Sequence, residues 1–134
     1  MIQRIQSIYM VLLAIINIIL IIAIDSDSSV SIPESYFGYF RIYLTDYFFA
    51  EIISLIVLIN IFFFKYSKTQ TNILRALALL LMFGFLNFID ERSFLISFQD
   101  PGLSYFLISF ILVMLSIRSI KKDQVIISSS NRLR

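Results

Sequence analysis

Four long apolar segments dominate the sequence and constrain what the chain can fold into. They cover residues 5–24, 47–64, 73–89 and 103–120, and each contains few strongly polar side chains. An α-helix rises about 1.5 Å per residue and the hydrocarbon core of a bilayer is about 30 Å thick, so a spanning helix needs about 17–25 residues. Each segment reaches that length. The sequence therefore predicts four transmembrane helices within a single domain that covers residues 1–134.

The composition supports a chain whose surroundings are mostly lipid. Apolar residues make up 59% of the sequence and charged residues 15%, whereas soluble domains contain about 45–50% and about 25%. So few polar side chains cannot cover the surface of a soluble globule. One apolar segment could be a buried helix of a soluble protein, but four without amphipathic partners are typical of a membrane protein. The predicted fold class is an all-α integral membrane protein with four transmembrane helices.

Charged residues are distributed unevenly between the two sides that four spans create. The loops at residues 25–46 and 90–102 fall on one side, and the termini and the loop at residues 65–72 fall on the other. All but two of the eleven Lys and Arg residues lie on the side of the termini, and of the nine Asp and Glu residues only Asp123 does. Lys and Arg in short loops mark the cytoplasmic side of a membrane. We therefore expect both termini in the cytoplasm.

The two outer loops contain segments that could form a cap over the helix ends. Residues 35–44 and 93–98 are rich in aromatic and β-branched side chains, which favour two short strands paired into a small β cap. An interfacial helix is the alternative for the first loop. It would carry an aromatic stripe at helical spacing, formed by Tyr36, Phe40, Tyr43 and Tyr47. We rank the strands slightly ahead and keep both interpretations.

Three polar side chains fall in the outer half of the predicted spans and form a candidate intramembrane polar cluster: Asn17, Glu51 and Asn87. Ionisable groups inside a membrane often mark proton or ion sites, but hydrogen bonds between helices use the same side chains. One carboxylate without a second acidic residue at depth is a poor ion pathway. We therefore favour hydrogen bonding, or an Arg partner for Glu51 from the outer loops. Asn60 is expected to bond to the first span near Gln6 and Ser7.

Basic residues gather at the cytoplasmic ends of the first and fourth spans. The fourth helix is predicted to continue through residues 118–127 into a basic tail at residues 121–134. The candidate docking or lipid contacts are Arg4, Lys121, Lys122, Arg132 and Arg134. Each cation near an anionic lipid surface gains about 1 kcal/mol, whereas the planar fork of Arg pairs with protein carboxylates in fixed geometry. We predict that residues 128–134 bind a partner.

The residue types that are missing exclude several functions. The chain has no Cys, His or Trp, which excludes disulfides, thiolate or imidazole metal sites, Cys nucleophiles and His-based triads. Its three Gly residues form no phosphate-binding loop. The net charge of +2 hides the charge asymmetry between the two sides, and it does not indicate nucleic-acid binding. We predict that the protein is not an enzyme, that it uses no cofactor or metal, and that it binds no nucleic acid.

Both ends of the chain and the turn after the second span carry motifs that resemble a known family. These are MIQRIQSIY at residues 1–9, FKYSKTQ at residues 64–70, IKKD at residues 120–123 and SNRLR at residues 130–134. Together with the spacing of the four segments, they are similar to a family of small four-span inner-membrane proteins of unknown function from the Bacteroidota. The resemblance implies a four-span topology in a Gram-negative inner membrane, and it implies no activity.

Three classes of function are compatible with the sequence. The first is a non-catalytic accessory or scaffold subunit of a larger membrane assembly, favoured by the small size, the short loops and the motif-like ends. The alternative is a small transporter or an oligomeric, holin-like pore that uses Glu51 and the intramembrane Asn residues. An intramembrane enzyme ranks last, because it would depend on Ser, Tyr or Glu51 alone. The expected partners are membrane lipids, with other membrane subunits or further copies of the same chain.

Overall fold

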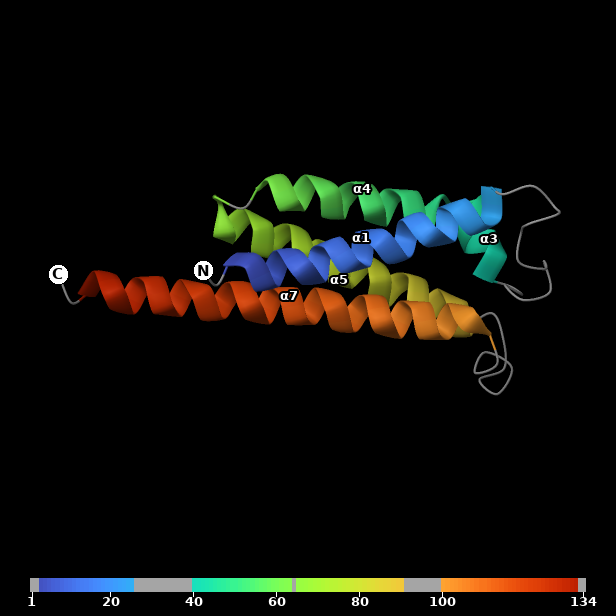
Figure 1. The fold of residues 1–134 in the computed structure, drawn as a ribbon. Coiled ribbons are helices and arrows are strands. Elements are labelled where there is room, and N and C mark those ends of the chain that lie inside the picture. The colour runs from blue at the N-terminus through green and yellow to red at the C-terminus, as the bar shows by residue number, and fades with distance from the viewer. Residues whose placement is uncertain (1–2, 26–39, 64, 91–99, 133–134) are drawn as a thin grey trace.

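The computed structural model is a helical bundle, and it describes residues 3–25, 40–63, 65–90 and 100–132. Within those ranges it contains no strand. Its helices are α1 (Gln3–Asp25), α3 (Phe40–Thr45), α4 (Phe49–Phe62), α5 (Ser67–Asp90) and α7 (Pro101–Arg132). The four longer helices lie side by side with alternating chain direction, and α3 sits at one end of them (Figure 1).

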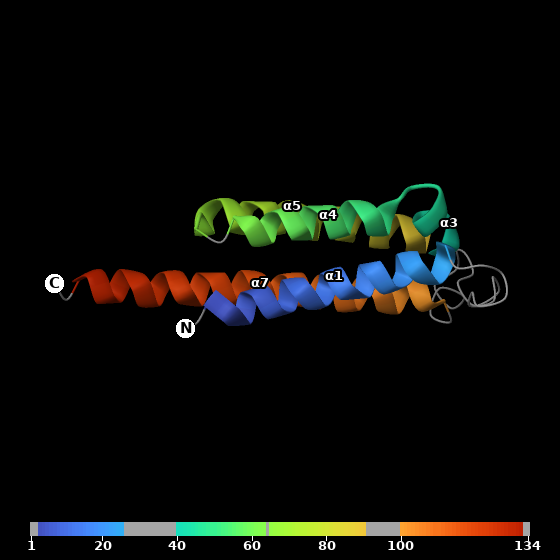
Figure 2. The ribbon, with the colours of Figure 1, turned by 45° about the horizontal axis from the view of Figure 1, so that its top comes forward.

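The four longer helices form two layers. Figure 2 shows α1 with α7 in one layer and α4 with α5 in the other. Between the layers, α1 packs against α4 and α5 packs against α7. Within the layers, α1 also packs closely against α7, whereas α4 and α5 contact each other much less. Most of the packing therefore comes from the two contacts between the layers and from the contact between the first and last helices, α1 and α7.

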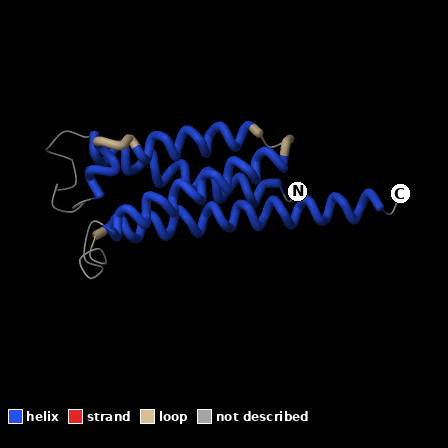
Figure 3. Tube along the Cα trace, turned by 180° about the vertical axis from the view of Figure 1, so that it is seen from behind, coloured by secondary structure: helices blue, strands red, loops and turns tan. Residues whose placement is uncertain are grey.

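The two ends of the bundle differ: one carries exposed lysines, and α3 packs against the other. The start of α1, the α4–α5 turn and the end of α7 lie at one end, and α3 lies at the other (Figures 1 and 3). We call the first the basic end, because Lys65, Lys68, Lys121 and Lys122 are exposed there. We call the second the cap end. At the basic end, α7 continues well beyond the start of α1 (Figure 3).

The turn between α4 and α5 is tighter than the predicted loop at residues 65–72. The Phe63 N–H donates to the Asn60 carbonyl at 3.2 Å, and the Tyr66 N–H donates to the Phe63 carbonyl at 2.9 Å. The Gln70 N–H then donates to the Tyr66 carbonyl at 2.9 Å, already within α5. Most of the predicted loop is therefore helical, and this places Gln70 inside the bundle.

Two residues at the start of α7, Asp100 and Pro101, explain why the helix begins there. Pro101 occupies the first helical position, where its missing N–H is not needed and its fixed φ suits a helix. The Asp100 carboxylate accepts the Gly102 N–H at 3.4 Å, and the Asp100 carbonyl accepts the Leu103 N–H at 3.2 Å. Acidic side chains before a helix commonly satisfy its first free N–H groups in this way.

The predicted strand in the first outer loop is wrong for residues 40–44, which form α3. Phe40, Tyr43 and Leu44 fall on one helical face and are buried, so the helical alternative describes this part of the aromatic stripe. The reason is tertiary packing: the Phe40 ring contacts the rings of Phe88 and Phe106, with centroids 6.3 Å and 5.8 Å away. Residues 35–39 and the second predicted strand at 93–98 lie outside the described residues.

Three of the four predicted spans are long and apolar enough to cross a membrane, namely α1, α5 and α7. α4 has only 14 residues, fewer than the predicted span at residues 47–64. The helix begins after Phe48, whose φ of 47° is left-handed, and it ends before Phe63. A helix of that length rises about 21 Å. The prediction of four helices of spanning length is therefore corrected to three such helices and one shorter apolar helix.

The bundle is apolar on its surface and partly polar inside. Large apolar side chains are exposed on every long helix, for example Ile19, Leu55, Phe83 and Ile111. The interior also holds polar side chains that are buried, namely Gln6, Asn17, Asn60, Gln70, Thr71, Ser109, Ser116 and Asp123. Soluble proteins show the opposite tendency, with polar residues mostly exposed. This distribution suits a protein surrounded by lipid.

Candidate functional site

The shortest hydrogen bond between buried side chains joins α7 to α1. The Tyr105 hydroxyl donates to Oδ1 of Asn17 at 2.6 Å, and Nδ2 of Asn17 donates to the Leu13 carbonyl at 2.8 Å. Both side chains are buried. Asn17 thus uses its acceptor for the neighbouring helix and a donor for its own, which fixes the orientation of the amide.

Glu51 of α4 lies close to the same tyrosine. Its carboxyl group and the Tyr105 hydroxyl interact electrostatically, and Oε2 of Glu51 is buried without a hydrogen-bond partner. Ser109 lies one turn along α7 from Tyr105, and its buried hydroxyl is close to the Tyr105 hydroxyl. We call Asn17, Glu51, Tyr105 and Ser109 the cap-half polar cluster. It collects polar side chains from three helices, and Oε2 of Glu51 has no hydrogen-bond partner in it.

Asn87 belongs to a different contact. Its Nδ2 donates to the Tyr43 hydroxyl at 2.9 Å, which joins α5 to α3. Burial raises the pKa of Tyr43, so the phenol stays neutral at physiological pH. These two residues line a cavity of about 480 Å³ beside Gly84 and Phe49. Of the three predicted cluster residues, the structure brings Asn17 and Glu51 to Tyr105 and gives Asn87 a separate partner.

A second set of buried polar side chains lies toward the basic end. Gln6, Asn60, Gln70 and Asp123 come from α1, α4, α5 and α7 in turn, and we call them the basic-half polar layer. The sequence predicted that Asn60 reaches the first span near Gln6. In the structure Nδ2 of Asn60 donates to Sδ of Met10 at 3.3 Å, one turn from Gln6.

Further hydrogen bonds connect this layer to α5 and α7. Nε2 of Gln70 donates to the Asn60 carbonyl at 3.4 Å. Nε2 of Gln124, the residue after Asp123, donates to Oγ of Ser67 at 3.0 Å, one turn before Gln70. Gln70 and Asp123 are interior groups that the sequence does not predict. The sequence predicts Gln70 in a loop and Asp123 in the basic cytoplasmic tail, and no sequence signal marks their burial.

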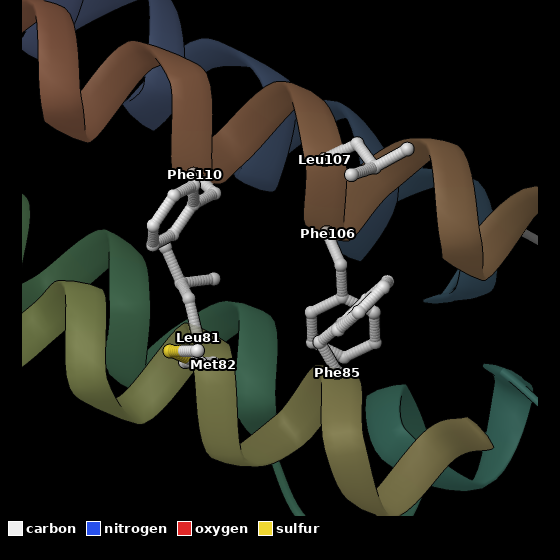
Figure 4. Close-up of a pocket in the computed structure, with 6 residues that line it drawn as sticks. All are labelled: Leu81, Met82, Phe85, Phe106, Leu107 and Phe110. Atoms are coloured by element: carbon white, nitrogen blue, oxygen red, sulfur yellow. The ribbon is translucent and has the colours of Figure 1, made fainter.

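A small apolar cavity separates α5 from α7. It measures about 180 Å³ and is lined by Leu81, Met82, Phe85, Phe106, Leu107 and Phe110. In Figure 4 the Phe85 and Phe106 rings lie against each other, and Phe110 points toward Leu81. The lining offers no titratable or nucleophilic side chain. The cavity can therefore accept an apolar chain but cannot perform chemistry on it.

The predicted basic contacts lie at the basic end where their positions are described. Lys121 and Lys122 are exposed on α7. The backbone places Arg4 in the first turn of α1 and Arg132 at the end of α7, and Arg134 lies outside the described residues. Among the side chains that the structure describes, no group of three His, Cys, Asp or Glu residues could hold a metal ion.

The fold and the buried polar groups define a helical bundle with an apolar exterior. A family model, described as domain of unknown function DUF4293, matches residues 2–133. The chain therefore belongs to this family, which confirms the resemblance to a family without an assigned function. No curated protein and no solved structure matches the chain.

The Tyr105–Asn17 contact yields a stability prediction. Tyr105→Phe removes the hydroxyl but keeps the ring, and it leaves Oδ1 of Asn17 buried without a donor. We expect a loss of about 1 kcal/mol, since interhelical hydrogen bonds in membrane proteins contribute about 0.6 kcal/mol on average and a stranded acceptor adds to the loss. Thermal unfolding of the purified protein in detergent micelles, followed by circular dichroism, measures the change.

Tyr66→Phe is the matched control, because Tyr66 is exposed at 65% and lies outside the cap-half polar cluster. It should unfold at the same temperature as the unchanged protein. Equal stability of Tyr105→Phe and Tyr66→Phe would show that the Tyr105–Asn17 bond does not hold the helices together.

Proposed function

We propose that the protein is a four-span integral membrane protein that acts as a non-catalytic accessory or scaffold subunit of a larger membrane assembly. One observation carries the membrane assignment: α1, α4, α5 and α7 all expose large apolar side chains, while polar side chains lie inside the bundle. In lipid such a surface is stable, whereas in water it would drive association. The expected partners are lipids and other membrane subunits, with further copies of the same chain as the alternative.

The short helix α4 is proposed as the fourth span. It lies beside α1 and α5 over its whole length (Figures 1 and 2), so a membrane that contains those helices surrounds α4 as well. Exposed aromatic side chains flank it, with Tyr47 and Phe48 before it and Phe63 and Tyr66 after it. Aromatic residues favour the membrane interface, and short apolar helices are accommodated by such flanks or by local thinning of the bilayer.

The proposed orientation follows from the basic end. The exposed lysines at the α4–α5 turn and on α7 share this end with the start of α1 and the end of α7 (Figure 3). By the positive-inside rule this end faces the cytoplasm and α3 faces the opposite side. The resemblance of the terminal motifs supports a bacterial inner membrane as the location.

The accessory role rests on the part of α7 that leaves the bundle. Beyond Lys122 the helix exposes Val125, Ile126 and Ile127 on successive positions and then continues with Ser residues and Arg132. Exposed apolar side chains on this part of α7 are stable only when they are removed from water, either in the headgroup region of the membrane or against a partner protein. A transporter or a holin-like pore is the second candidate, favoured by the unpaired buried oxygen of Glu51.

Reporter fusions test the proposed topology. A periplasmic-type reporter fused at Ser29 or Gln99 should be active, and a cytoplasmic-type reporter at these positions should be inactive. Fusions at Thr69, in the first turn of α5 at the basic end, should give the reverse pattern. An active cytoplasmic reporter at Ser29 would contradict the orientation, and a periplasmic signal at Thr69 would exclude α4 as a span.

The accessory role predicts a stoichiometric partner that depends on the tail. Truncation after Ile127 should remove the partner that co-purifies in mild detergent, as measured by quantitative mass spectrometry. The double variant Arg132→Lys with Arg134→Lys should keep insertion and topology but weaken the association, because Lys keeps the charge and loses the planar fork. Recovery of the same proteins at the same ratio by all three forms would contradict docking through residues 128–134.

A further inference from the structure

An open groove runs along the outer face of α7 toward the basic end. It measures about 530 Å³, and five apolar side chains between Phe110 and Ile117 line it together with Arg118 and Lys121. Met114 is half exposed in the middle of this lining, and both cations are exposed. We call this space the α7 groove. Because α7 runs toward the basic end (Figure 3), the cations lie at the basic end of the groove and the apolar lining lies deeper in the bundle.

The apolar end of the α7 groove adjoins the cavity between α5 and α7. Phe110 lines both spaces, and in Figure 4 its ring points toward Leu81 of α5. The cavity adds about 180 Å³ and is lined only by Leu, Met and Phe side chains. An apolar surface therefore continues from the two cations along α7 and into the contact between α5 and α7.

Arg118 and Lys121 carry positive charges that the protein does not neutralise. Among the side chains that the structure describes, neither forms an ion pair, and the described lining of the groove contains no acidic residue. Asp123 is the only acidic residue of α7, and both of its carboxylate oxygens are buried without a hydrogen-bond partner. Two cations beside an exposed apolar surface are complementary to a molecule that joins an anionic group to an apolar chain.

The length of the α7 groove matches one leaflet of a bilayer. From Lys121 to Phe110 the helix rises about 16 Å, and half of the hydrocarbon core is about 15 Å thick. A phospholipid whose phosphate lies beside the two cations therefore has an acyl chain long enough to reach Phe110. A second copy of the chain fits less well. Symmetric copies have the same orientation in a membrane, so their Arg118 and Lys121 side chains would meet at the same depth and repel each other.

We propose that the α7 groove binds one anionic phospholipid of the cytoplasmic leaflet. Its phosphate contacts Arg118, which offers paired N–H donors, and Lys121, which offers a point charge. One acyl chain lies along Met114 and Phe110 and ends at the cavity between α5 and α7. This binding site rests on the proposed membrane location and orientation of the chain, and it does not depend on the accessory role.

Native mass spectrometry tests the site on the full-length protein. The protein is released from micelles that contain equal amounts of phosphatidylglycerol and phosphatidylcholine with the same acyl chains. We expect one phosphatidylglycerol to stay bound to each chain in preference to phosphatidylcholine. Glycerol phosphate, which carries the anionic group without acyl chains, should not displace it. The double variant Arg118→Gln with Lys121→Gln should bind phosphatidylglycerol about 30-fold more weakly, since each cation near an anionic lipid contributes about fivefold.

Matched variants separate the groove from the general charge of the basic end. Lys122→Gln removes the same charge as Lys121→Gln, but Lys122 is exposed and does not line the groove. Lys121→Gln should weaken binding about fivefold, and Lys122→Gln should leave it nearly unchanged. Met114→Trp fills the groove and keeps both cations, so it should prevent the lipid from being retained. Ile108→Trp is its control, because Ile108 is equally exposed on α7 outside the lining.

Equal weakening by Lys121→Gln and Lys122→Gln would overturn the site, because general attraction to the basic end would then explain the binding. Equal retention of the two phospholipids, displacement by glycerol phosphate, or a dimer of the chain without lipid would also overturn it. Flotation of the same preparation with phosphatidylcholine vesicles distinguishes this result from failure of the proposed function. A chain that floats but shows no lipid preference contradicts the lipid site alone, whereas a chain that does not float contradicts the membrane location as well.

Discussion

An apolar exterior forces the polar groups of this chain to find partners inside, and the arrangement of the helices depends on how they do so. The contact between Tyr105 and Asn17 is the shortest of these side-chain bonds and joins the two helices of one layer. At the other half of the bundle, Asn60 and Gln70 connect α1, α4 and α5. Large apolar residues fill the remaining interior, so the few polar contacts specify which helices are neighbours.

The contacts of α3 with α5 and α7 are also made inside the bundle, by aromatic side chains. Phe40 and Tyr43 turn inward and contact rings from α5 and α7, so the cap end is closed by aromatic side chains. The close approach of α5 to α7 depends on a single glycine. A Cβ at Gly84 would lie 2.8 Å from the Phe106 ring, and the aromatic contacts of Phe106 leave that ring little room to move.

Hydropathy predicts the helical fold and the approximate depth of each residue along the predicted spans. It does not predict which faces of the helices pack against each other. The long apolar runs of α1 and α7 were predictable because length and composition decide them. The strand preference at residues 40–44 failed because β-branched and aromatic propensity is weaker than the tertiary contacts of Phe40. The sequence predicts that Asn87 lies at a similar depth in the membrane to Asn17 and Glu51, but it does not predict which way the side chain faces. Asn87 lies on a face of α5 that is turned toward Tyr43. The burial of Gln70 and Asp123 could not be predicted, because it depends on the packing of neighbouring helices.

The position of α4 in the proposed membrane bundle can be measured directly. The chain has no Cys, so single Cys substitutions along α4 can each carry one spin label in reconstituted vesicles. Collision rates with oxygen, which partitions into lipid, should peak at the exposed positions Leu55, Ile59 and Phe62 and be lowest at the buried positions Ile53 and Val57. Collision with a water-soluble nickel complex at Leu55 and Ile59, or a profile without helical periodicity, would contradict the account.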